Sequence, residues 1–179
     1  MFPLRAVLCA GLLAGLLGCD AHASGESLAR TEESADLPPL TGRVVDNANL
    51  LSVRTEAALT TKLAALEGRR TDQLVVVTLP SLHGNTIERV GLRLGRGWGI
   101  GQVDKNNGVL LIIAPNERKV RIEVGTGLES AIEDHEAARM IETIMLPSFH
   151  AGALESGIVA GADAIIAELD RSPLAEANR

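Results

Sequence analysis

The stretch NGVLLIIAPNERKVRIEVG, residues 107–125, decides the fold. Its apolar run at 109–113 is typical of a strand that is buried on both faces. Pro115 and Asn116 then open a turn. In the last part apolar residues alternate with Arg121 and Glu123, as in a strand with one buried face. We therefore predict two successive strands joined by a short turn.

Further elements are predicted on both sides of this stretch. A short strand is expected at 43–45 and a buried strand at 74–79. One helix should run from the N-cap Ser52 to Gly68, and a second should begin at the capping-box pair Asn85 and Glu88. Two more helices follow, separated at Pro147, with apolar faces at Ala137, Met140, Ile141 and Ile144 and at Ile158, Ala162, Ile165 and Leu169. The order β-α-β-α-β-β-α-α predicts an α/β fold with helices on both faces of a small mixed sheet.

The composition predicts a globular protein with little affinity for nucleic acid. Of the 179 residues, 46% are hydrophobic, 22% are charged and 2% are aromatic, and the formal net charge is -6. Binding to nucleic acid requires a clustered basic face and usually aromatic side chains for base stacking. We therefore expect one domain and no nucleic-acid partner.

The N-terminus has the pattern of an export signal. Arg5 precedes an apolar run that is too short to span a bilayer comfortably, and this run ends in LLGC at residues 16–19. The ending resembles the bacterial lipobox, in which the chain is cut before the cysteine and the cysteine receives acyl chains such as palmitate. The resemblance implies a signal peptide at 1–18 and a lipid anchor on Cys19.

The segment after Cys19 has the composition of a tether. Residues 20–41 are rich in Ala, Ser, Glu and Pro and show no apolar period. We expect a lipidated N-terminus and tether at 19–41, a folded domain at 42–170 and a tail at 171–179. Asp20 resembles the signal that retains lipoproteins in the inner membrane, which implies the periplasmic face of that membrane within the cell envelope. The alternative is an ordinary signal peptide that is cut near residues 21–24.

Three polar loops carry side chains whose oxygens suit a hard cation. One follows the strand at 43–45, one precedes the strand at 109–113, and one follows the last strand. Ligands collect at the carboxyl ends of strands in open α/β sheets, so we expect the first and third loops at one rim. Whether Asp104, in the second loop, joins them depends on the strand order.

The candidate residues also have structural interpretations. Asp104 and Asn107 fit a turn before a strand, because Asn-Gly tolerates a positive φ. Glu129 fits a helix capping box, and Asp134 could complement a helix dipole. A similar choice applies to three arginines on the polar face of the second helix, which form either a solvated face or a contact with anionic headgroups. They are Arg89, Arg93 and Arg96.

Several strings, in order and spacing over residues 42–169, resemble the TPM domain family. They are RVVDNANLL at 43–51, LVVV at 74–77, WGIG at 98–101, NGVLLI at 107–112, VRIEVG at 120–125 and PSF at 147–149. The resemblance implies a three-layer α/β/α sandwich with acidic loops at one end, where some members bind calcium. Carried onto this chain, the acidic-loop positions are Asp46, Asp104, Asn107, Glu129 and Asp134. Many relatives have an acidic residue where Asn106 stands, so the cation site is expected to be weaker here.

The resemblance also implies a functional class. Bacterial members are exported or membrane-anchored, and plant members are linked to photosystem II repair. For this chain we predict an accessory module that binds calcium or another divalent cation and helps to assemble or maintain a membrane protein complex. One alternative is a weak metal-assisted acid phosphatase, with Asp46 and Asp104 around a cation. A second alternative is an interaction domain that binds no ligand.

Overall fold

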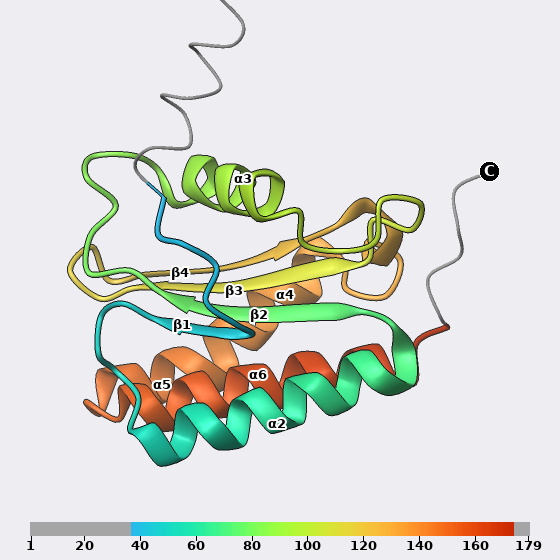
Figure 1. The fold of residues 1–179 in the computed structure, drawn as a ribbon. Helices are drawn as coiled ribbons and strands as arrows, with labels where there is room; N and C mark the ends of the chain where they lie inside the picture. Colours follow the sequence, from blue (N-terminus) through green and yellow to red (C-terminus); the bar gives the residue numbers. More distant parts are fainter. Residues whose placement is uncertain (1–36, 174–179) are drawn as a thin grey trace, which may run out of the picture.

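The computed structural model describes residues 37–173, so the predicted signal peptide, Cys19, most of the predicted tether and the end of the predicted tail lie outside the described residues. A four-stranded sheet forms the centre of the fold (Figure 1). Its strands are β1 (Val44–Asp46), β2 (Gln73–Thr78), β3 (Gly108–Ala114) and β4 (Lys119–Val124). They lie in the order β1-β2-β3-β4, with the first three parallel and β4 antiparallel to β3. The predicted mixed sheet is confirmed.

Helices cover both faces of the sheet, which confirms the three layers (Figure 1). One face carries α3 (Ile87–Trp98), and the other carries α2 (Val53–Arg70) and α6 (Leu154–Arg171). Between β4 and α6 the chain forms the short elements η1 (Thr126–Leu128), α4 (Asp134–Met140), η2 (Ile141–Met145) and α5 (Leu146–His150). Within residues 37–173 no helix combines the length and the apolar character needed to cross a membrane.

The two central strands supply most of the contact between the layers. Every residue of β3 is buried, as is β2 apart from its first residue. Val76 and Leu111 belong to the larger core, shared with α2 and α6, whereas Val77 and Ile112 belong to the smaller core beneath α3. Fully burying one such side chain contributes about 1.5–3 kcal/mol. The continuous apolar runs of the sequence therefore fix the middle of the sheet.

Helix α2 ends two residues later than predicted. Gly68 was expected to stop the helix, but α2 continues to Arg70. Thr71 takes the left-handed conformation instead, with φ 67°, and its N–H donates to the carbonyl of Glu67 at 2.8 Å. Threonine thus occupies a position that glycine usually takes at a helix C-terminus.

Helix α3 also begins differently from the prediction. Its N-cap is Thr86, whose hydroxyl accepts the N–H of Arg89 at 3.3 Å, and not Asn85. On its polar face Arg89 and Arg96 are exposed, whereas Arg93 is half-buried. Exposure of Arg89 and Arg96 is compatible with both interpretations of this face, so the choice between them stays open.

The chain around Pro147 is helical and is not a break between two helices. A π-helical turn, η2, connects α4 to α5, and Leu146 donates its N–H to the carbonyl of Ile141. Pro147 then lies in the first turn of α5, where a missing N–H removes no intrahelical hydrogen bond. The separation of two helices that was predicted at Pro147 is therefore absent. In its place the π-helical turn η2 keeps the apolar side chains facing the core.

Two surface carboxylates hold neighbouring segments together. Glu117, in the β3–β4 turn, accepts the N–H of Leu82 at 2.9 Å and the hydroxyl of Ser81 at 2.8 Å. These bonds hold the pKa of Glu117 below its ordinary value. On α6, Asp170 accepts a hydrogen bond from Arg69 of α2 at 2.7 Å, and this bond lowers the pKa of Asp170.

We expect the protein to lose stability as the pH falls below about 4.3, the ordinary pKa of glutamate. A carboxylate with a lowered pKa in the folded state stabilises the fold above its unfolded pKa, and this contribution is lost as the pH falls through the folded value. In Glu117→Gln the free energy of unfolding should fall less between about pH 5 and pH 3 than it does in wild type. Urea unfolding at each pH measures the difference.

The control for this prediction is Glu142→Gln. Glu142 is exposed on η2 and its side chain makes no hydrogen bond or ion pair within residues 37–173. This variant should keep the wild-type pH dependence. If the free energy of unfolding of Glu117→Gln falls with pH as steeply as that of wild type, Glu117 does not contribute to the loss of stability in acid.

Candidate functional site

The predicted cation ligands lie at two opposite edges of the sheet. Because β1, β2 and β3 are parallel, their C-terminal ends meet at one edge, the carboxyl edge, and their N-terminal ends at the other, the amino edge. Asp46 pairs with Thr78 at the carboxyl edge, and Gly108 pairs with Gln73 at the amino edge. These two edges are about 17 Å apart, at about 3.3 Å per residue along β2.

The carboxylate of Asp46 is used within its own loop. One oxygen accepts the N–H of Leu50 at 3.1 Å and the hydroxyl of Thr78, and the other accepts the N–H of Leu51 at 2.8 Å. Thr78 in turn accepts the N–H of Ala48 at 2.9 Å. Asp46 therefore closes the loop between β1 and α2 and fastens it to β2.

The prediction that the first and third polar loops share one rim is wrong. Since β4 is antiparallel to β3, the loop that follows β4 lies at the amino edge, beside the start of β3. Asp104 and Glu129 are thus on loops at the edge opposite Asp46. The arrangement in which Asp46 and Asp104 hold one cation for a phosphatase reaction is wrong for the same reason.

At the amino edge two of the predicted loops are packed backbone to backbone. They are residues 102–107, before β3, and residues 125–129, after β4. The N–H of Gly127 donates to the carbonyl of Asn106 at 3.2 Å. A Cβ atom on Gly127 would lie 1.8 Å from the carbonyl oxygen of Lys105, so only glycine permits this approach.

Asn107 has a structural role at this edge. Its side chain is fully buried. The side-chain amide N–H groups donate to the carbonyl of Thr71 at 2.9 Å and to the carboxylate of Asp72 at 3.2 Å, and its oxygen accepts the N–H of Gln102 at 2.8 Å. Asp72 is buried too and pairs with Arg70 at 2.9 Å. The amide oxygen of Asn107 is therefore directed into the protein.

Arg70, Asp72 and Thr78 carry structural contacts that no sequence pattern marked. Arg70 and Asp72 pair across Thr71, which takes a positive φ that the sequence did not predict. Thr78 is the last residue of an apolar strand and gave no separate signal. The direction of β4, in contrast, could have been deduced, because a turn as short as residues 115–118 joins only antiparallel strands.

The remaining candidates supply two exposed carboxylates on adjoining loops. Asp104 is exposed on the first loop and Glu129 on the second. Asp134 is exposed in the first turn of α4, where a carboxylate stabilises the helix dipole. Within residues 37–173 no three His, Cys, Asp or Glu side chains are grouped so that they could hold a metal ion. The five predicted ligands thus do not form one site, and cation binding by Asp104 and Glu129 stays a prediction.

Comparisons with known proteins give the chain a family and a set of similar structures. A family model for the TPM domain matches residues 44–168. The solution NMR structure of the N-terminal domain of a protein from P. gingivalis is 34% identical, with a TM-score of 0.72 over 82% of this chain and 96% of that chain. No curated protein matches.

Two more distant structures share the fold. The N-terminal domain of the cg2496 protein from Corynebacterium glutamicum is 17% identical, with a TM-score of 0.57 over 81% of this chain and 92% of that one. The BA42 protein from the psychrophilic bacterium Bizionia argentinensis is 16% identical, with a TM-score of 0.60 over 70% of this chain and 86% of that one. At these identities the likeness concerns the fold alone.

Proposed function

Since the chain belongs to the TPM domain family, we propose that it is a lipid-anchored accessory module of the cell envelope. In this proposal Cys19 holds the domain at the periplasmic face of the inner membrane. The domain takes up a divalent cation at its amino edge and binds a membrane protein complex. The cation part is supported by the contact between residues 102–107 and residues 125–129, because it brings together the loops that carry Asp104 and Glu129.

The chemistry of the amino edge favours a weak site for a hard cation. Calcium takes six to eight oxygen ligands, which can include backbone carbonyls and water. Two carboxylates supply part of such a set, and the amide of Asn106 contributes no charge. Few charges give low affinity, so we expect a dissociation constant on the order of 1 mM, as in extracellular calcium modules.

Calcium is expected to stabilise the protein against unfolding. With a dissociation constant of about 1 mM, about 10 mM calcium adds about 1.4 kcal/mol to the free energy of unfolding. Asp104→Asn and Glu129→Gln should remove this increment, because each deletes one of the two charges. Urea unfolding with calcium, compared with urea unfolding at the same ionic strength in sodium chloride, measures it.

Asp46→Asn is the matched control for these two variants. It removes the same type of charge at the carboxyl edge and weakens a hydrogen-bonded loop, so it should lower stability by about 1–2 kcal/mol. The increment from calcium should nevertheless remain. Loss of the increment in Asp46→Asn, or its retention in Asp104→Asn, would overturn the proposed location.

The anchor is tested separately by replacing Cys19. In cells fed with labelled palmitate we expect wild type to carry the label in the membrane fraction. Cys19→Ala should lose the label and leave that fraction, because two or three acyl chains are needed for durable attachment. Cys9→Ala, which alters a residue of the predicted signal peptide, should behave as wild type. An unlabelled wild-type protein would favour the ordinary signal peptide instead.

A further inference from the structure

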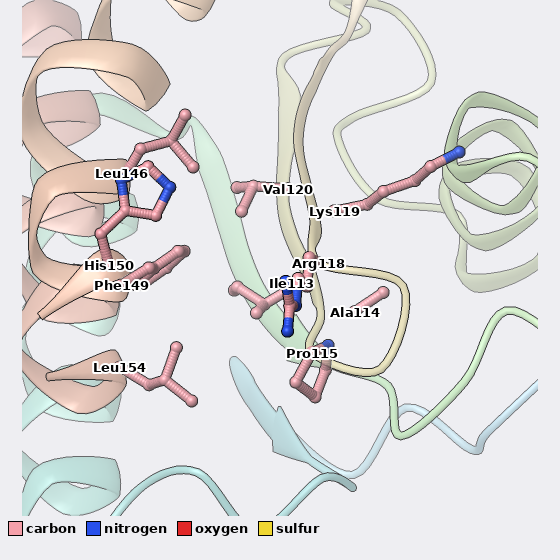
Figure 2. Close-up of a pocket in the computed structure, with 10 residues that line it drawn as sticks. All are labelled: Ile113, Ala114, Pro115, Arg118, Lys119, Val120, Leu146, Phe149, His150 and Leu154. Atoms are coloured by element: carbon pink, nitrogen blue, oxygen red, sulfur yellow. The ribbon is translucent and has the colours of Figure 1, made fainter. Parts of the chain in front are cut away.

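A pocket of about 440 Å³ lies on the side of the carboxyl edge away from Asp46, between the β3–β4 hairpin and the helices α5 and α6 (Figure 2). Its volume is within the range of small-molecule sites. The walls are mostly apolar and come from segments far apart in the sequence. They are formed by Ile113, Val120, Leu146, Phe149 and Leu154.

The polar side chains that line this pocket are basic. Figure 2 shows Arg118 on the hairpin side and His150 on the helix side, and no acidic side chain is among the lining residues. Lys119 contributes to the lining, but its side chain points away from the pocket toward α3. The positive charge at the mouth of the pocket therefore comes from Arg118, and the imidazole of His150 lies on the facing helix.

Arg118 is available to a ligand. Within residues 37–173 its side chain makes no hydrogen bond or ion pair. Glu117, its neighbour in the turn, is already bound by Ser81 and Leu82 on the other side of the hairpin. A guanidinium group stays protonated at all physiological pH values and can bind a carboxylate or phosphate through two parallel hydrogen bonds.

We propose that this pocket binds a small amphipathic anion, a carboxylate or phosphate group carried on a short hydrocarbon chain. The anionic group pairs with Arg118 at the mouth, and the chain lies against Phe149 and Leu154. Apolar walls with a few polar groups at one end match this class of ligand. The proposal is independent of the cation site, because the pocket lies at the opposite edge of the sheet.

Arg118→Gly removes the charge of Arg118 and keeps the conformation of the turn. Arg118 has a φ of 53°, a conformation that glycine adopts without the steric cost of a side chain. This variant should therefore keep or raise the melting temperature while it removes the guanidinium group. Arg89→Gln is the control, since it removes an exposed arginine from α3.

The test is a titration of the ¹⁵N-labelled protein, carrying Cys19→Ala so that no covalent lipid competes, followed by NMR. Decanoate and decyl phosphate are the anionic probes, used below their micelle concentrations, and decyl alcohol is the neutral probe, used below its solubility limit. Decanoate represents a free fatty acid, and decyl phosphate represents a phospholipid-like headgroup. The probe that binds more tightly therefore identifies which of these two classes the natural ligand belongs to. Saturable shifts are expected at residues 113–120 and 146–154 with both anions.

Two comparisons decide the proposal. The dissociation constant of decyl alcohol should be about tenfold higher than that of the tighter-binding anion. Arg118→Gly should raise the dissociation constant of that anion about tenfold, as expected for the loss of a charge-assisted hydrogen bond. Arg89→Gln should bind as wild type does. The proposal is overturned if neither anion shifts these residues, if decyl alcohol binds as tightly, or if Arg118→Gly leaves binding unchanged.

Discussion

Asp72→Ala is expected to lower the free energy of unfolding by about 3–5 kcal/mol. Asp72 is fully buried and its carboxylate pairs with Arg70, whose side chain is only 9% exposed. Removing the carboxylate leaves a guanidinium group in a poorly hydrated site, and it also removes an acceptor for Asn107. Urea unfolding followed by circular dichroism measures the loss.

The double variant Arg70→Met, Asp72→Leu is the control for this prediction. Replacing both members of a buried pair by apolar residues is often nearly neutral, because no unpaired charge remains. Arg70 also donates to the carbonyls of Ser172 and Pro173, so some cost is expected even here. The double variant should still be more stable than Asp72→Ala. A loss below about 1 kcal/mol in Asp72→Ala would contradict the importance of the pair.

Gly127→Ala is expected to cost about 3 kcal/mol. Its methyl group would lie 1.8 Å from the carbonyl oxygen of Lys105, and the carbonyl oxygen of Asn106 is also within 3.3 Å. Both neighbours are backbone atoms, so the two loops of the amino edge must move apart. The variant should therefore lose calcium stabilisation as well as stability, and unfolding with and without calcium measures both.

Gly68→Ala is the matched substitution at a site with free space. Gly68 is exposed on α2, and a Cβ atom there would meet nothing within 4 Å. Alanine favours the helical conformation, so this variant should gain about 0.5–1 kcal/mol. If Gly127→Ala is as stable as wild type, residues 102–107 and 125–129 are not packed backbone to backbone.

The layered fold could be predicted because it depends on local patterns. Buried strands need continuous apolar runs, which residues 74–79 and 109–113 provide, and the alternation in 120–124 predicted a strand with one apolar face. The polar face of that strand is partly covered, because Glu123 and Arg121 lie against Gly91 of α3. Helix ends were less predictable. Helix α2 ends at Arg70, two residues beyond Gly68, because the next residue, Thr71, takes a positive φ. That conformation depends on the surroundings of Thr71 in the fold.

The candidate site was predicted less well because it depends on contacts between distant segments. Asn107 has the residue type of a ligand, but burial beside Asp72 gives it a structural role. The positive φ expected for the Asn-Gly pair occurs one residue earlier, at Asn106. Arg118 and His150 are far apart in the sequence, and only the packing of the β3–β4 hairpin against α5 brings them to one pocket.

We propose that cation binding belongs to the amino edge and that Asp46 serves only the structure of its own loop. A calcium titration followed by the backbone amide shifts of the ¹⁵N-labelled protein tests it most directly. We predict saturable shifts at residues 102–107 and 125–129 at millimolar calcium, with residues 46–51 unaffected. Shifts centred on residues 46–51, or no response at millimolar calcium, would contradict the claim.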